Sequence, residues 1–253
     1  MDKVKTTSPE RVSKMNIEQF LSELEKMHIY LTEEQLHQFE VYYQTLIHWN
    51  EKMNLTAITE KGDVYLKHFY DSLTIVREFP LLLTENFTVC DVGAGAGFPS
   101  IPLKIAFPYI QVSIVDSLKK RINFLEELVK TLKLTDVHLY HDRAEIFGQI
   151  PQHRERYDLV TARAVAKMSI LSEFCLPLVK PSGYFIALKG ASGEEELEEG
   201  KKAIRTLGGN ISGVQSFLLP FENSERTIIH IHKTKPTPKK YPRKPGIPVK
   251  NPL

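Results

Sequence analysis

The segment 89–97 carries the clearest chemical signal in the chain, Val-Cys-Asp-Val-Gly-Ala-Gly-Ala-Gly. An apolar run followed by three alternating glycines predicts a buried strand and a tight turn, whose backbone N–H groups approach a nucleotide-like ligand. Gly93, Gly95 and Gly97 have the spacing Gly-x-Gly-x-Gly. A dinucleotide fingerprint would need its third glycine at position 98, where this chain has a phenylalanine. The spacing therefore favours S-adenosylmethionine over NAD as the cofactor.

Two further positions sharpen this interpretation. Asp116 ends the next apolar strand, where a carboxylate can accept both ribose hydroxyls of a nucleoside. Its alternative role is to cap the following helix. Ala144 and Glu145 follow the third predicted strand, in the loop that lines an adenine ring in this architecture, although a solvated loop is the alternative. We predict that Gly93, Gly95, Asp116, Ala144 and Glu145 bind the cofactor.

Arg163 ends the fourth predicted strand, where methyltransferases place the residues that meet the methyl acceptor. Its guanidinium suits a carboxylate or an acceptor oxygen, and a surface salt bridge is the alternative. No Asn/Asp-Pro-Pro-aromatic loop follows this strand, as methylation of an exocyclic amine would need. Cys90 and Cys175 lie in apolar segments and are interpreted as reduced core residues, not as nucleophiles. An acceptor that is already nucleophilic remains, such as guanine N7.

Guanine N7 has a lone pair and no proton to lose, so its methylation depends on positioning more than on a general base. The sequence offers no nucleophile–base dyad. Catalytic residues therefore remain unassigned at this stage, and we expect no metal.

A helical block precedes the first strand. Two capping-box signals, Asn16 with Gln19 and Thr32 with Gln35, predict the start of two amphipathic helices. A third helix is expected over about 63–78 and contains His68 and Asp71, which lie one helical turn apart. We expect a structural hydrogen bond between these two side chains.

From residue 87, strands and helices alternate, which predicts a parallel sheet covered on both faces. The strand candidates are 87–91, 110–115, 137–140, 157–161, 183–188, 211–218 and 227–232. The connection 219–226 is too short for a parallel crossover, so the sheet should finish antiparallel. We predict an α/β, Rossmann-like class I methyltransferase fold: a mostly parallel seven-stranded sheet with an antiparallel final strand, preceded by a helical N-terminal extension.

Composition and length limit the possible partners, location and domain organisation of the protein. The chain has 253 residues and a net charge of only +2, so overall charge identifies no partner. We see no signal peptide and no apolar run near membrane-spanning length, and we expect a cytoplasmic protein with no membrane partner. The predicted regions are a flexible extension over 1–15, a helical region over 16–82, a methyltransferase domain over 83–233 and a basic, proline-rich tail over 234–253.

The tail is a strongly basic region. Residues 233–253 contain seven Lys or Arg and no Asp or Glu. Prolines should keep the tail extended, so that its cations can lie along phosphates; a solvated, disordered terminus is the alternative. We predict RNA binding by Lys239, Lys240, Arg243 and Lys244.

Residues 89–103 resemble the signature Asp-x-Gly-x-Gly-x-Gly-[Leu/Phe]-Pro-Gly-Ile-Pro-Leu of the small-subunit ribosomal RNA guanine-N7 methyltransferases, also named glucose-inhibited division protein B. Ser100 departs from the pattern, where that family often has glycine. The resemblance runs from about residue 16 to the C-terminus, and five further segments are also similar: 49–56, 68–72, 116–121, 163–164 and 187–190.

The resemblance implies a bacterial enzyme that methylates N7 of one guanine in the decoding-region loop of 16S rRNA, with 16S rRNA or the small ribosomal subunit as partner. It implies cofactor contacts at Gly93, Phe98, Ala144, Glu145 and Arg163, of which Phe98 is added as an apolar wall. We expect a monomer. Two rivals remain: a methyltransferase for another RNA or a small molecule, and a cofactor sensor that binds nucleic acid through its tail.

Overall fold

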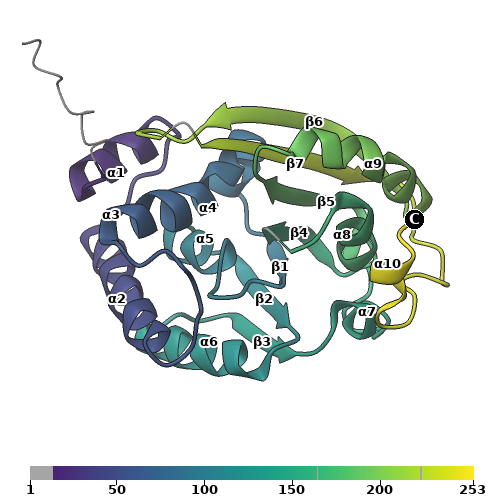
Figure 1. Cartoon of the computed structure of the whole chain (residues 1–253), viewed down its shortest axis with the longest axis horizontal. Coiled ribbons are helices and arrows are strands. Elements are labelled where there is room, and N and C mark those ends of the chain that lie inside the picture. The colour runs from purple at the N-terminus through teal and green to yellow at the C-terminus, as the bar shows by residue number, and fades with distance from the viewer. Residues whose placement is uncertain (1–13, 164, 223) are drawn as a thin grey trace, which may run out of the picture.

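The computed structural model describes residues 14–163, 165–222 and 224–253. In this described part, seven strands form one sheet in the order β3-β2-β1-β4-β5-β7-β6 (Figure 1). Neighbours from β3 to β5 pair in parallel, whereas β7 runs antiparallel to both β5 and β6. The strands are β1 (Thr88–Val92), β2 (Gln111–Asp116), β3 (Val137–His141), β4 (Tyr157–Arg163), β5 (Val179–Lys189), β6 (Gly209–Leu218) and β7 (Glu225–Lys233). The predicted sheet and its antiparallel finish are confirmed.

Helices cover both faces of the sheet (Figure 1). The α-helices are α1 (Ile17–Glu25), α2 (Glu33–Asn50), α3 (Lys61–Val64), α4 (Asp71–Leu73), α5 (Ser100–Ala106), α6 (Lys119–Thr131), α7 (Ala144–Phe147), α8 (Met168–Cys175), α9 (Gly193–Thr206) and α10 (Ile247–Lys250). Three short helices of other types are η1 (a π-helix, Tyr65–Tyr70), η2 (Thr74–Arg77) and η3 (Pro80–Leu83), the last two being 3₁₀-helices.

Alternation along the central strands separates two hydrophobic cores, because successive side chains point to opposite faces. Val89 and Ile114 pack against the N-terminal helices with α5 and α6, whereas Cys90 and Val115 pack against α7, α8 and α9. Cys90 and Cys175 are both free and buried, so their interpretation as core residues is confirmed. No helix in the described ranges has both the length and the apolar character needed to cross a bilayer.

The N-terminal block begins its helices where the sequence predicts. Asn16 with Gln19 and Thr32 with Gln35 each form both reciprocal hydrogen bonds of a capping box. The third helix begins at Lys61 and is not uniform, since the wide turn η1 interrupts it and η2 ends it. Such wide turns recur at functional sites. The expected flexible extension lies mostly outside the described residues.

The end of that extension belongs to the fold. Met15 is only 3% exposed and packs in the N-terminal core, and Lys14 forms a surface ion pair with Glu60.

The C-terminal tail folds back onto the methyltransferase domain. Tyr241 is buried, and Arg154 donates hydrogen bonds to the carbonyl oxygens of Tyr241 and Thr237. The helix α10 follows, beside α8 (Figure 1). The expectation of an extended tail is therefore wrong, because its backbone carbonyls find donors on the domain surface instead of water.

Candidate cofactor-binding site

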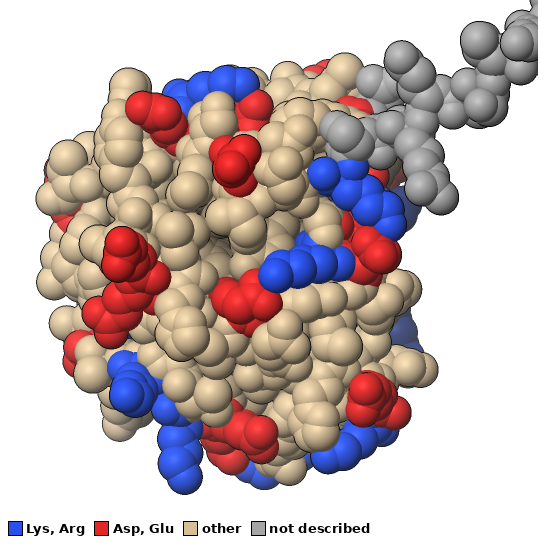
Figure 2. Space-filling model, turned by 90° about the vertical axis from the view of Figure 1, so that its left-hand side faces the viewer, with Lys and Arg blue, Asp and Glu red and all other residues tan. Residues whose placement is uncertain are grey.

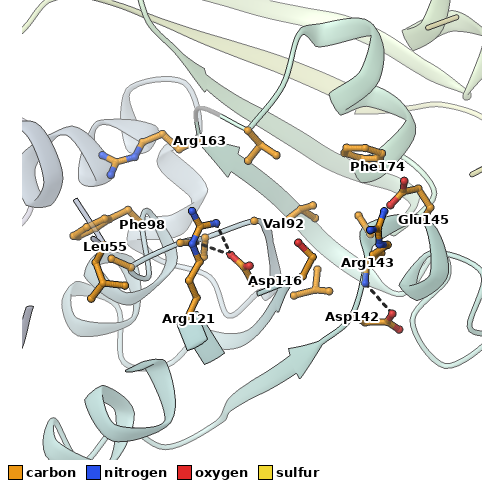
Figure 3. A pocket seen from close by; sticks show the side chains of 18 of the residues that line it. Leu55, Val92, Phe98, Asp116, Arg121, Asp142, Arg143, Glu145, Arg163 and Phe174 are labelled. Atoms are coloured by element: carbon orange, nitrogen blue, oxygen red, sulfur yellow. Dashed lines mark hydrogen bonds and ion pairs between the residues drawn. The ribbon is translucent and has the colours of Figure 1, made fainter. Parts of the chain in front are cut away.

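A cavity of about 580 Å³ opens at the carboxyl ends of β1, β2, β3 and β4 (Figure 3). This is the edge where open α/β sheets bind ligands, at the point where the strand order reverses between β1 and β4. The cavity has three parts: a middle formed by the glycine turn and Asp116, an adenine end at α7, and an acceptor end at Phe98 and Arg163. These names anticipate the ligand predicted from the sequence. All seven predicted cofactor residues line the cavity, and one of them, Arg163, does so from the end of β4.

The glycine turn needs its glycines for different reasons. Gly93, Gly95 and Gly97 all have positive φ, at 74°, 61° and 96°. A Cβ on Gly97 would lie 2.8 Å from the hydroxyl of Tyr42 and from Ile101, so this glycine permits close packing against α2 and α5. At Gly95 the same position has no heavy atom within 4 Å, and its backbone faces the cavity. Gly95 therefore leaves room for a ligand.

Asp116 is almost fully buried at the end of β2 and organises the middle of the cavity. One oxygen, Oδ2, accepts hydrogen bonds from the Gly95 N–H at 3.2 Å and from Arg121 at 3.3 Å. The other, Oδ1, accepts from the Leu118 N–H at 2.9 Å. Asp116 thus links the glycine turn to the start of α6, while its carboxylate still lines the cavity. The predicted capping contribution and a ligand contact are compatible, because a carboxylate has about four acceptor positions.

At the adenine end, Ala144 and Glu145 form the first turn of α7. The side chain of Glu145 is buried, yet it lines the cavity with Phe174 from α8 (Figure 3). Two residues of the tail, Gly246 and Val249, line this end as well. Phe174, Gly246 and Val249 were not predicted as site residues, because nothing in the sequence around them indicates where they pack.

Strand alternation explains the acceptor end. Arg163 and Leu159 have the same parity on β4, so both point toward the core formed with the N-terminal helices. The guanidinium lies 4.8 Å from the centre of the Phe98 ring, and the His68 ring is stacked 4.4 Å from the same centre. Leu55 and Thr56 complete this end from the loop between α2 and α3. The N-terminal block therefore builds one wall of the cavity.

An ion network anchors Arg163. Its guanidinium donates to Asp71 Oδ2 at 3.2 Å, to His68 Nδ1 at 3.1 Å and to the Lys67 carbonyl at 3.1 Å. The second oxygen of Asp71 accepts from Arg226 Nε on β7 at 3.0 Å. The expected pairing of His68 with Asp71 is therefore wrong: both bond to Arg163, which lies between them. Their helical spacing was the available signal, but it did not reveal the third partner.

His68 is held in one neutral form. Burial, and then the charge of Arg163, lower its pKa to about 3. Because Arg163 donates to Nδ1, the ring proton resides on Nε2, which lies 2.8 Å from the Thr56 hydroxyl. At neutral pH His68 thus has no free nitrogen lone pair directed into the cavity.

A second buried acid lies behind the turn. Asp91 is fully buried in β1, and desolvation raises its pKa to about 7 despite a hydrogen bond from the Ser100 N–H at 3.1 Å. Its second oxygen, the Ser100 hydroxyl and the hydroxyl of Thr161, its register partner on β4, have no hydrogen-bond partner among the described residues. This cluster is polar but lies outside the cavity lining.

The predicted RNA-binding residues divide into two kinds. Lys239, Lys240 and Lys244, here named the tail lysines, are exposed. Arg243 instead forms hydrogen bonds with both carboxylate oxygens of Glu173, whose side chain is fully buried. The face formed by the N-terminal helices carries scattered charges of both signs without a continuous basic patch (Figure 2). In the described ranges, no group of three His, Cys, Asp or Glu side chains could hold a metal ion.

The strand order, the single antiparallel strand and the cavity at the switch point define a Rossmann-like methyltransferase fold. A proposed sarcosine dimethylglycine methyltransferase from Galdieria sulphuraria shares the fold with a TM-score of 0.50 and 13% identity, over 64% of this chain and 85% of that chain. The [4+2]-cyclase SpnF shares it with a TM-score of 0.51 and 14% identity, over 65% and 81%. Because a cyclase has this fold too, the fold alone does not determine the reaction.

Sequence similarity is more specific. The chain belongs to the rRNA small subunit methyltransferase G family (GidB), whose profile matches residues 35–228. Proteins named ribosomal RNA small subunit methyltransferase G from Bacillus licheniformis and Bacillus pumilus are 62% and 61% identical to it. Each comparison extends over 239 residues, which is 94% of this chain and 99% of the relative. The family predicted from the motifs is therefore confirmed.

Proposed function

We propose that this protein transfers the methyl group of S-adenosylmethionine to N7 of one guanine in the decoding-region loop of 16S rRNA. The observation that carries the proposal is that the glycine turn, Asp116 and the α7 residue Glu145 all line the same cavity. Membership of the rRNA small subunit methyltransferase G family supports small-subunit rRNA as the substrate. A cytoplasmic location follows from that substrate, and we propose that the protein acts as a monomer.

The residues fit this cofactor. The space beside Gly95 is open, so a ligand can approach the backbone of the turn closely. Asp116 offers carboxylate oxygens where ribose hydroxyls would lie, and Glu145 offers a carboxylate edge with Phe174 as an apolar neighbour. The cavity volume of about 580 Å³ lies within the usual range of roughly 300–1,000 Å³ for small-molecule sites. When bound, S-adenosylmethionine supplies a methyl group activated by a sulfonium.

In this mechanism the main task of the protein is to position guanine N7 against the methyl group. Bound S-adenosylmethionine would supply the methyl group, which N7 would accept with its own lone pair as the sulfonium became a thioether, and N7 would lose no proton. A general base is therefore unnecessary, in keeping with a His68 that is neutral and already hydrogen-bonded on both nitrogens. Phe98, His68 and Leu55 line the acceptor end, where they would align the reacting atoms and so lower the barrier.

Arg163 acts in this proposal as a positioning residue. Its guanidinium already donates to Asp71, His68 and a backbone carbonyl, and its side chain is only 14% exposed. It is therefore better suited to hold the Phe98 and His68 rings than to clamp a substrate directly.

The test is methyl transfer from radiolabelled S-adenosylmethionine to small ribosomal subunits, and to naked 16S rRNA, from a strain that lacks this gene. The labelled nucleoside is identified by mass spectrometry. We expect 7-methylguanosine. Label in another nucleoside would retain the methyltransferase and overturn the acceptor. Cofactor binding without label on either substrate would favour a different substrate or the sensor alternative.

A further inference from the structure

The tail is fixed to the domain by a buried carboxylate. Glu173 on α8 is fully buried, and Arg243 donates to its Oε1 from the backbone N–H at 2.8 Å and from Nε at 2.9 Å. A third bond joins Arg243 to Oε2 at 2.6 Å. Removing one partner of a buried ion pair leaves an uncompensated charge, so this contact strongly favours the docked tail.

Contacts from the α7 region reinforce the docking. Gln149 donates to the Pro242 carbonyl at 2.6 Å, and Arg154 donates to the Tyr241 carbonyl at 2.7 Å. Both donors follow α7, the helix that begins with Ala144 and Glu145. The tail is therefore connected to the same short segment that forms the adenine end of the cavity.

The tail also reaches the cavity itself. The Gly246 N–H donates to Glu145 Oε1 at 3.0 Å, and Gly246 has a left-handed backbone with φ of 84°. Val249, one turn further on, lines the cavity although the residue is 58% exposed. Val249 is therefore an exposed apolar residue at the rim of the cavity, and an apolar group of a bound ligand would cover it.

We propose that residues 243–249 are a wall of the adenine subsite. Arg243 docks the wall, Gly246 orients the Glu145 carboxylate, and Val249 with Phe174 provides apolar surface for the purine ring. This inference rests on the proposed function, because it takes the ligand to be an adenine nucleoside. Docking of the tail and binding of the nucleoside then favour each other, and the coupling is reciprocal.

The decisive variant is Val249→Ser, which changes an exposed side chain and leaves the buried contacts intact. Its matched control is Val214→Ser, since Val214 on β6 is 41% exposed and lies outside the cavity lining. We expect the dissociation constant of S-adenosylhomocysteine, measured by calorimetry on the full chain, to rise about 3–10-fold in Val249→Ser, as loss of apolar contact worth one or two methyl groups predicts. The control should bind like the unmodified protein.

Adenosine is the second probe, because it retains the base and lacks the amino-acid half. The same loss of affinity is expected with adenosine; a loss seen only with S-adenosylhomocysteine would place Val249 at the wrong end and overturn the inference. Arg243→Met should weaken both ligands by at least about tenfold if it folds. Unchanged affinity in the folded Val249→Ser protein would also overturn it. Failure of the unmodified protein to bind either ligand would instead reject the proposed cofactor.

Discussion

The two ends of the cavity are constructed in different ways. At the acceptor end, Arg163 and Asp71 lie in a buried network that joins η1, α4, β4 and β7. At the adenine end, Glu145 has one backbone hydrogen bond from the tail, and the adjacent wall residue Val249 is mostly exposed. The first end is assembled by folding of the core, whereas the second depends on a terminal segment that docks on its surface.

The difference indicates how the two ends should respond to change. In the acceptor-end network, loss of Asp71 leaves the Arg163 and Arg226 charges without their shared partner, which is destabilising. Contacts at an exposed rim affect ligand binding more than folding. Variants at the acceptor end should therefore lower stability, and variants at the adenine end should mainly lower cofactor affinity.

The largest effect is expected at Asp71. Asp71→Ala leaves Arg163 and Arg226 without their shared carboxylate, and the free energy of unfolding should fall by about 3–5 kcal/mol. Denaturant unfolding measures this change. Asp63→Ala is the control, because Asp63 forms a surface pair with Lys67 and should contribute less than about 1 kcal/mol. Equal losses in the two variants would show that the network does not stabilise the fold.

Asp116 lies between the two ends and should mainly affect the ligand. Asp116→Ala removes a buried carboxylate that we assign to the ribose, and affinity for S-adenosylhomocysteine should fall by about 10–100-fold, as expected for hydrogen bonds to a charged group. Calorimetry on the purified protein measures it. Glu126→Ala on the exposed side of α6 is the control. Unchanged affinity in a folded Asp116→Ala protein would reject the ribose assignment.

The tail lysines should mainly affect RNA, because their side chains are exposed and do not line the cavity, although Lys244 belongs to the wall segment 243–249. Replacing all three by Gln should weaken RNA binding about tenfold at low salt and reduce the slope of log affinity against log salt by roughly 2. Filter binding at several salt concentrations gives both values. The control replaces three cations of α9: Lys201, Lys202 and Arg205. If the tail and control variants have the same slope, the tail does not contact RNA phosphates.

The smallest effect concerns Asp91, whose pKa is raised to about 7 from an ordinary value near 3.8. Between these values the folded protein binds a proton that the unfolded chain releases, so stability contributed by the protonated acid is lost as pH rises toward 7. Asp91→Asn removes this loss. At pH 8 the variant should therefore have the higher Tm of the two proteins.

Thermal melts at pH 4 and pH 8 test this prediction. The advantage of Asp91→Asn should be large at pH 8 and small at pH 4. His68 titrates in the opposite sense in both proteins, since its lowered pKa makes low pH destabilising, and its contribution cancels in the difference. An equal difference in Tm at the two pH values would mean that Asp91 does not carry the proton.

Local patterns in the sequence determined the class of the protein. Alternating strand and helix periods predict the sheet, because period and turn chemistry depend on neighbouring residues. The glycine turn, Asp116 and the loop at Ala144 all follow strands, and parallel strands bring their carboxyl ends to one edge. The family motifs then narrowed the class to a group that the full-length relatives confirm.

Only the tertiary structure decided which charged side chains pair with one another. Arg163 and Asp71 form a hydrogen bond although they are 92 positions apart in the sequence. The separation is 155 positions for Arg226 and Asp71, and 70 for Arg243 and Glu173. All four predicted RNA-binding residues of the tail are cations that look available for RNA in the sequence, yet one of them, Arg243, pairs with the buried acid Glu173. Pairings of this kind depend on which surfaces the folded chain brings together. They leave no period or spacing in the sequence, because the partners are adjacent only after the sheet has formed.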